Sequence, residues 1–474
     1  MLPKNLAYGS KVESASARSY RTNIQPQNGT GNYNAGDTII INIPTRNNLV
    51  FVPSESYLKF THTVTIGAGN SNYTRFDSCG AHGLFQRIRV FHGSNLLSDI
   101  DNYGLLSKIL FDLQVPTDAC YGKYNILAGT RNDLTVTIPT LVAGDFSGGV
   151  FSALSLPAVQ TNSGLRMNTA QSAANSTLTQ TFCLNLITLA GTLCKDKYFP
   201  LFACTSAPLR VEIQLVPSLQ SGLCIHLAST FALSNVEYIA QMIELSDNAM
   251  NIIKESQNGQ PLQFVNPDYR NYQYNFSLAN AVTQITMPIP AKFSSLKSIF
   301  VTARDTAKSC GVLTFFPYSC NKFSISSYFF RIGATVMPSK VPDTVAEMFS
   351  ECVKAIGSMS DLDHQPSIEI SSYSQDVPIN NQIASGGDGS IATATAFFNQ
   401  SNVHSGSFYV GLDLENYANA DKGAIFSGWN SNTDDIYFIP TYGAQAGATN
   451  TRFDAFALFD TVICFDNGTC YVKY

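Results

Sequence analysis

Runs in which apolar and polar residues alternate make up most of this chain. Residues 208–216 are a clear case, because Leu209, Val211, Ile213 and Leu215 alternate with polar residues. Successive side chains of a strand point to opposite faces, so this pattern predicts a strand with one buried face. Comparable runs occupy residues 37–44, 56–66, 85–92, 235–245, 269–278, 294–305, 321–338, 406–414, 434–442 and 454–474. Short runs divided by Gly, Pro and Asn predict an all-β chain built from sandwiches.

A helical pattern interrupts the strands after Gly93. Its apolar residues recur at spacings of three and four, which places them in one stripe along a helix. The stripe consists of Tyr103, Leu106, Ile109, Leu110 and Leu113. We expect the helix to begin at Asp101, whose carboxylate can accept hydrogen bonds from the free amides of the first turn.

The same order of parts returns half a chain length later. A strand ends at Gly333, a polar turn follows, and Thr344 and Glu347 have the spacing of a capping box. The next apolar stripe ends before Gly357 and consists of Val345, Met348, Phe349, Cys352, Val353 and Ile356. The repeated order predicts a tandem duplication of one sandwich, with a helix in each copy that covers an open edge or the end of the core. Two unrelated surface helices are the alternative.

The predicted organisation has four parts. They are an N-terminal arm at 1–34, a first sandwich at 35–246, a linker at 247–261 and a second sandwich at 262–474. The linker is polar and ends in Gly and Pro, which is typical of a short helical connection. Two long segments without strong periodicity, 114–180 and 357–405, are expected to be loop insertions in an assembly role or, alternatively, disordered inserts.

The arm is rich in Ser and Asn and locally basic. It carries Lys4, Lys11, Arg18 and Arg21 against Glu13. We expect an extended segment, which either wraps a neighbouring molecule or has no fixed structure.

Composition adds two constraints. Only 13% of the 474 residues are charged, against roughly 25% in an average soluble domain. Either two large cores or surfaces buried against partners would explain so few charges. The net charge of −5 excludes a general basic field for non-specific nucleic-acid binding. No signal peptide or membrane span is expected, and the eleven Cys without a C-x-x-C pair are expected to be free thiols.

Four stretches, taken in order, carry a resemblance to a known family. They are "LFQRIRVFHGSNLLSDIDNYGLL", "YFPLFACTSAPLRVEIQLV", "SSLKSIFVTARD" and "FYVGLDLENY" followed by "FSGWN". In this succession they resemble the major capsid proteins of the double jelly-roll lineage, as found in polinton-like viruses, virophages and large eukaryotic DNA viruses. The resemblance covers about residues 35–474 and rests on the order and type of the motifs.

The resemblance implies a double jelly roll, two tandem eight-stranded jelly rolls that each carry a short helix and long loop insertions. It implies a major capsid protein whose homotrimers have a pseudo-hexagonal outline and tile an icosahedral shell around double-stranded DNA. The long loops would form outward towers, and the arm would reach neighbouring trimers or minor and penton proteins. An internal membrane contact is possible within this family. The implied location is the virion, assembled in the host cytoplasm or nucleus, without sequence-specific nucleic-acid binding.

Catalytic chemistry has little support in the residues. The chain contains no P-loop, G-x-S-x-G or H-E-x-x-H motif, and we assign no catalytic, cofactor or metal residue and expect no enzyme. Cys79 and His82 are two potential metal ligands without a second pair. Asp361, Asp363 and His364 form a polar cluster in a loop. A glycosidase-type pair of carboxylates is an alternative interpretation of this cluster.

Two cysteines, one histidine and one tryptophan bear on whether the chain has disulfides, ligand-binding residues or a carbohydrate site. Cys464 and Cys470 flank a predicted hairpin turn and could face each other across it, although reduced thiols are the default. His62 lies on an apolar strand face, which favours a core histidine over a ligand. The rival function is a carbohydrate-active or carbohydrate-binding β-sandwich, but a single Trp, Trp429, is few for sugar platforms. A viral fibre or spike would show much shorter repeats.

Overall fold

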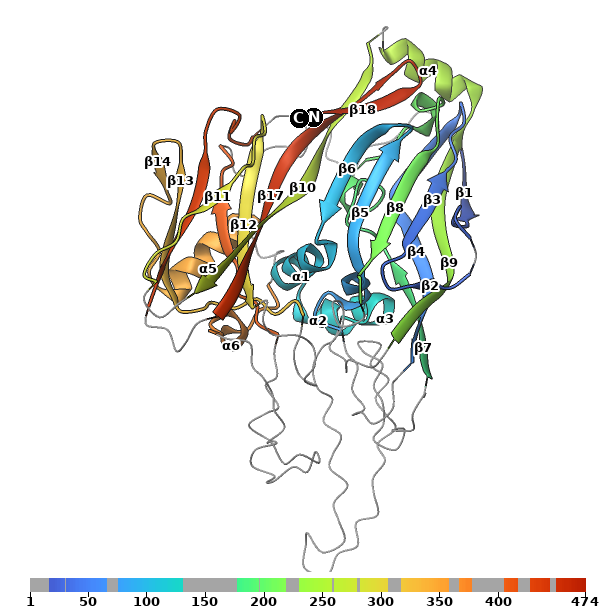
Figure 1. Cartoon of the computed structure of the whole chain (residues 1–474). Helices are drawn as coiled ribbons and strands as arrows, with labels where there is room; N and C mark the ends of the chain where they lie inside the picture. The colour runs from blue at the N-terminus through green and yellow to red at the C-terminus, as the bar shows by residue number, and fades with distance from the viewer. Residues whose placement is uncertain are drawn as a thin grey trace, which may run out of the picture.

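The computed structural model consists of two β-sandwiches that stand side by side. Figure 1 shows the first half of the chain in blue to green and the second half in yellow to red. The structure describes residues 17–474 except for 30, 66–75, 131–176, 196, 219–229, 258–259, 279–281, 306–316, 358–365, 377–404, 417–426 and 444–448.

The first sandwich has two antiparallel sheets. Their strand orders are β1-β9-β4-β7, with β2 paired to β9, and β3-β8-β5-β6. The strands are β1 (Ala17–Ile24), β2 (Tyr33–Asn34), β3 (Thr38–Ile43), β4 (Leu49–Thr65), β5 (Phe85–His92), β6 (Asn95–Asp101), β7 (Thr177–Leu184), β8 (Leu209–Leu215) and β9 (Thr230–Leu245).

The second sandwich repeats this arrangement. Its sheet orders are β10-β17-β12-β15, with β18 paired to β17, and β11-β16-β13-β14. The strands are β10 (Leu262–Leu278), β11 (Met287–Ile289), β12 (Leu296–Asp305), β13 (Ile325–Ile332), β14 (Thr335–Met337), β15 (Val410–Asp413), β16 (Ile436–Tyr442), β17 (Thr449–Asp466) and β18 (Thr469–Lys473).

Short helices lie mainly in the connections between strands. They are α1 (Tyr103–Gln114), α2 (Thr117–Tyr121), α3 (Lys123–Ala128), α4 (Asp247–Gln257), α5 (Val345–Lys354), α6 (Ile370–Tyr373) and the 3-10 helices η2 (Gly80–Leu84), η4 (Thr192–Cys194) and η5 (Leu201–Ala203). Helix α4 lies between β9 and β10, within the segment expected as a helical linker. Among the described residues, no helix is long and apolar enough to cross a membrane.

Strand order makes the two sandwiches equivalent. If β2 and β18 are set aside, β1 corresponds to β10, β3 to β11, and so on through β9 and β17, so that each sandwich is an eight-stranded jelly roll. Helices α1 and α5 both follow the fifth of these strands. The expected double jelly roll with one principal helix per copy is confirmed.

The alternating runs form the core as the pattern predicts. Leu209, Val211, Ile213 and Leu215 of β8 are all fully buried. The core of the first sandwich also takes in residues of the second, among them Tyr409. The two sandwiches are therefore joined through buried surface and not only through the linker.

The start of the first helix differs from the expectation. Residues 95–101 form β6, which pairs antiparallel with β5 across a two-residue turn that begins at Gly93, with φ +59. Asp101 is the last residue of β6, and α1 begins after Asn102, which has a left-handed backbone and no side-chain capping bond. The prediction that Asp101 is the N-cap was therefore wrong. Asp101 still belongs to the second strand of the hairpin, so the helix begins one residue later than its apolar stripe indicated.

The second copy follows the expectation more closely. Gly333, with φ +57, begins the equivalent turn between β13 and β14. Thr344 caps α5 by accepting a hydrogen bond from the Glu347 amide at 3.2 Å. The Glu347 carboxylate accepts from the Asp343 amide at 3.3 Å, so the reciprocal half of the capping box is shifted by one residue.

Part of the expected arm belongs to a sheet. Residues 17–24 form β1, which pairs with β9 from Ala17 to Ile24. Most of its side chains are exposed and only Ile24 is buried, because β1 is an edge strand. An edge strand with few apolar residues resembles an arm in sequence, and the extended-arm interpretation was wrong for this segment. Residues 1–16 of the arm lie outside the described residues.

Candidate assembly site at the junction of the two sandwiches

Helix α1 lies between the two sandwiches. Figure 1 shows it beside β6 of the first sandwich and facing β10 and β17 of the second. Every residue of α1 except Gln114 is buried. A methyl group on Gly104 would lie 2.4 Å from the Tyr318 hydroxyl of the second sandwich, so the helix approaches its neighbour closely. Since one face of α1 covers its own sandwich, burial of the other face requires the second sandwich.

A buried ion cluster holds α1 at this position. The Lys108 ammonium lies 3.2 Å from Asp77 Oδ1 and 2.9 Å from Asp112 Oδ2. It also donates to Ser78 at 3.1 Å and to Ser407 at 3.3 Å. The Lys108 side chain is only 1% exposed. Burial would lower the pKa of Lys108, but the Asp112 and Asp77 carboxylates outweigh it and raise this pKa above its ordinary value.

The second sandwich supplies the other hydrogen bonds of this cluster. Ser407 and Tyr409 donate to Asp112 Oδ2 at 2.8 and 2.6 Å. Ser405 donates to Asp77 Oδ2 at 2.7 Å. Buried charges are tolerated only when they are paired and hydrogen-bonded. Here the charges are paired within the first sandwich, and residues of the second sandwich supply hydrogen bonds to both carboxylates. The cluster therefore fixes the relative position of the two sandwiches.

A second cluster lies around Asp454 of β17. Its carboxylate pairs with Arg304 and Arg452, each at 2.9 Å, and accepts from Asn102 Nδ2 at 3.0 Å. Burial lowers the pKa of Arg304, while Asp454 raises it, with a net upward shift. Asn102 is the residue before α1, so the start of the helix is bound to the opposite sandwich.

Further along the junction, the β5–β6 hairpin contacts β10 and β18. Ser98 donates to Asp268 at 3.0 Å, and Asn95 donates to the Cys470 carbonyl at 3.0 Å. His92 Nδ1 accepts from the Cys470 amide at 3.0 Å. Burial raises the pKa of Asp268 to about 7.

The metal-ligand hypothesis for Cys79 and His82 has no support in the described part of the chain. Cys79 is fully buried, and burial raises the pKa of its thiol. His82 Nδ1 lies 2.9 Å from the Tyr103 hydroxyl beneath α1, and burial lowers the pKa of His82 to about 3. No group of three or more His, Cys, Asp or Glu that could hold a metal occurs among the described residues. Asp361, Asp363 and His364 lie outside them.

Cys464 and Cys470 are free thiols, as the default interpretation had them, and only the alternative that they face each other is wrong. In the β17–β18 hairpin Cys464 pairs with Tyr471, and Cys470 pairs with Phe465. Because paired residues share a face and neighbours alternate, Cys464 and Cys470 point to opposite faces. A hydrogen bond with the Cys204 thiol of the first sandwich, together with burial, raises the pKa of Cys470.

His62 and Trp429 have structural roles. His62 packs among Phe76, Phe182 and Phe231, and burial lowers its pKa to about 3, as expected for a core histidine. The Trp429 indole donates to Asp434 at 3.1 Å and is only partly exposed, which does not suit a sugar-stacking platform.

The junction clusters were missed in the sequence. Lys108 and Asp112 have the i,i+4 spacing of an ordinary surface ion pair, which gives no sign of burial. One signal was present, because the residues around them are apolar on more than one face of the helix. A helix that is apolar nearly all round is typical of a buried one.

Comparison with known proteins finds solved structures with a similar fold. No protein-family model and no curated protein sequence matches the chain. The capsid of the virus PBCV-1 matches over 98% of this chain and 99% of its own, with a TM-score of 0.58 and 10% identity. The Faustovirus major capsid protein matches over 97% and 92%, with a TM-score of 0.53 and 10% identity. The mavirus major capsid protein matches over 99% and 92%, with a TM-score of 0.51 and 11% identity. The chain has the double jelly-roll fold of these capsid proteins.

Proposed function

We propose that the chain is a major capsid protein, a structural protein of a virion and not an enzyme. The observation that carries this proposal is the whole-length likeness to capsid proteins, over more than nine-tenths of both chains. The junction supports it, because its buried charges hold two equivalent sandwiches in one fixed relation, as a rigid building block needs. The carbohydrate alternative receives no support from these comparisons.

The proposed assembly is a homotrimer with six jelly rolls in a pseudo-hexagonal outline. A contact between unlike faces closes into a ring when its rotation allows. Trimers then tile an icosahedral shell, with penton and minor capsid proteins as further partners. An internal membrane contact, and assembly in the host cytoplasm or nucleus, complete the proposal. Segments 114–180 and 357–405 contain α2, α3, the start of β7 and α6. Their longest remaining parts, 131–176 and 377–404, lie outside the described residues and are the ones assigned to outward towers.

The mass of the purified chain tests this function. Light scattering is expected to give three times 51.5 kDa, and negative-stain images are expected to show hexagonal outlines. A stable monomer would contradict the proposal, and so would hydrolysis of a glycan.

The N-terminal arm has its own test. Deletion of residues 1–16 leaves β1 in place, so trimers are expected to form normally while the yield of closed shells falls. A deletion through residue 25 serves as the comparison, because it removes β1 and is expected to impair the trimer itself. An unchanged shell yield after the shorter deletion would show that residues 1–16 have no role in shell assembly.

A further inference from the structure

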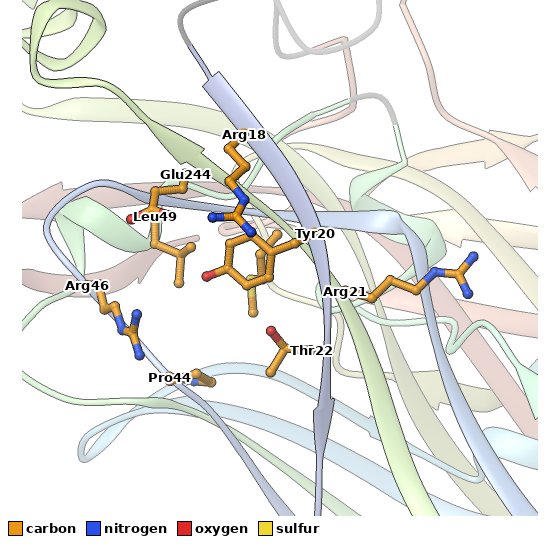
Figure 2. Close-up of a pocket in the computed structure, with 9 residues that line it drawn as sticks. Arg18, Tyr20, Arg21, Thr22, Pro44, Arg46, Leu49 and Glu244 are labelled. Carbon is orange, nitrogen blue, oxygen red and sulfur yellow. The ribbon is translucent and has the colours of Figure 1, made fainter.

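A hollow beside β1 gathers three arginines at the surface. It has a volume of about 470 Å³ and is lined by Arg18, Arg21 and Arg46 among others. Figure 2 shows Arg18 and Tyr20 on one side of β1 and Arg21 on the other. All three arginines are exposed, so water solvates their charges and the hollow needs no ligand. The junction of the two sandwiches differs, because it holds reactive side chains that are fully buried.

Cys204 and Cys470 form a pair of thiols across this junction. Cys204 follows η5 in the first sandwich, and Cys470 lies in β18 of the second. Both residues are fully buried, and both are free thiols. Their two thiols share a hydrogen bond, so the sulfur atoms face each other with no other side chain between them.

His92 holds the backbone of both cysteines. Its Nδ1 accepts from the Cys470 amide at 3.0 Å, so the proton of the neutral ring is on Nε2. Nε2 lies 3.2 Å from the Cys204 carbonyl and donates to it. Two residues away on each side, the Ser206 amide donates to the Gly468 carbonyl at 3.0 Å. These bonds keep the two chain segments at a fixed distance, which is what a disulfide between facing thiols requires.

Both cysteines lie directly beneath exposed turns. Thr205 and Ser206, which follow Cys204, are exposed, and so is Asn467 in the turn that precedes Cys470. Strand β18 has only five residues and pairs with the end of β17. A short terminal hairpin opens locally at a lower free energy than the whole fold. A small molecule in solution can therefore reach the two thiols while the hairpin is open.

We propose that Cys204 and Cys470 form a disulfide that joins the two sandwiches when the protein meets an oxidising solution. The oxidant is a low-molecular-weight disulfide. The thiolate of one cysteine attacks a sulfur atom of this molecule and releases one small thiolate, and the thiolate of the other cysteine then displaces the second. Two S–H bonds are lost and one S–S bond forms, while the small disulfide takes up two electrons and two protons and leaves as two thiols.

The disulfide adds a covalent link to a junction otherwise held by hydrogen bonds, ion pairs and apolar contacts. It closes a loop that contains β8, β9, the linker and nearly all of the second sandwich. Closing a long loop restricts the unfolded chain strongly, so the oxidised protein is the more stable form. The bond lies within one chain and forms in a monomer as well as in a shell, so it does not depend on the proposed function.

Oxidation of the purified full-length chain tests this proposal. The protein is incubated with oxidised glutathione, alkylated and compared with a sample kept in dithiothreitol. The intact mass is expected to fall by about 2 Da, and a non-reduced digest should contain the peptides of Cys204 and Cys470 joined together. Free thiols, counted after denaturation, should fall by two from the eleven of the sequence. The unfolding temperature is expected to rise by about 4 °C and to return when the bond is reduced.

Serine variants identify the pair. Cys470→Ser and Cys204→Ser should each abolish the joined peptide and the rise in unfolding temperature, and the cysteine that remains should carry glutathione as a mixed disulfide. Cys352→Ser is the matched control, because Cys352 is equally buried in the second sandwich, and this variant should keep the joined peptide and the rise. An unchanged thiol count in the wild-type chain would overturn the proposal. So would a disulfide between other cysteines, or a rise in unfolding temperature that persists in Cys470→Ser.

Discussion

Helices α1 and α5 occupy the same place in two copies of one sandwich, yet their surroundings differ. Helix α1 is buried along its length and carries a buried lysine, whereas only Met348 and Cys352 of α5 are buried. Lys354 of α5 is half-exposed and pairs with Glu351 at 2.6 Å. Of the two equivalent helices, α1 is thus covered on both sides, whereas α5 is partly exposed among the described residues.

This difference separates two roles that the sequence pattern cannot tell apart. The inner stripe of each helix covers its own core, as Met348 does for the second sandwich. The outer face of α1 binds the other sandwich through hydrogen bonds of Lys108 and Asp112 to Ser407 and Tyr409. On α5, every side chain other than those of Met348 and Cys352 is at least partly exposed.

The largest expected effect comes from removing the buried lysine. Lys108→Met leaves Asp77 and Asp112 buried without their counter-charge, which should lower the free energy of unfolding by about 3–5 kcal/mol. Lys354→Met at the equivalent helix should cost at most about 1 kcal/mol, because its ion pair is exposed. Urea unfolding of both variants measures the difference.

A rescue variant makes this prediction specific. Lys108→Met combined with Asp77→Asn and Asp112→Asn removes all three charges, and most of the lost stability should return. Equal losses for Lys108→Met and Lys354→Met would show that the two helices are not as different as their burial indicates.

Low pH should lower the stability of the folded protein through His82, which lies beneath α1. Its pKa is about 3 in the folded protein because of burial, against about 6.5 in the unfolded chain. The unfolded state therefore takes up the proton first, and stability is lost as the pH falls from 6.5 towards 3. The loss from this residue is expected to be about 2 kcal/mol between pH 6 and 4.5. The variant His82→Phe should remove this part of the pH dependence, and an unchanged slope of unfolding free energy against pH would contradict it.

Close packing of α5 gives a third, smaller effect. A methyl group on Gly411 of β15 would lie 2.7 Å from Cys352 Cα, which belongs to the helix backbone and has little room to move. Gly411→Ala is expected to cost about 1–3 kcal/mol by overpacking. Gly443→Ala, where the nearest atom is 3.5 Å away, is the control and should be nearly neutral. Thermal unfolding distinguishes them, and equal values would show that α5 does not pack tightly on β15.

Sequence patterns predicted the features that depend on local periodicity. The alternation in β8 identified a strand with one buried face, and Gly93 and Gly333 marked the ends of two equivalent strands, although the second strand of each hairpin was not expected. The capping residue Thr344 was also correct, because an N-cap acts within one helical turn.

The features that the sequence did not reveal depend on distant parts of the chain. Strand β1 is defined by pairing with β9, more than two hundred residues away, and its exposed residues carry no periodic signal. The partners of Lys108 come from both sandwiches, as does the hydrogen bond of Asn102 to Asp454. A local pattern cannot contain such contacts.

The smallest effect concerns how the two helices begin. Thr344→Ala removes a local cap and should cost about 1 kcal/mol, with Thr344→Ser close to wild type. Helix α1 has no such cap, and the Asn102 side chain bonds instead to Asp454 of the second sandwich at 3.0 Å. Asn102→Ala should therefore weaken the junction as well as the helix, visible as faster amide exchange in both β17 and α1. Exchange confined to α1 would mean that this helix starts by local forces, as α5 does.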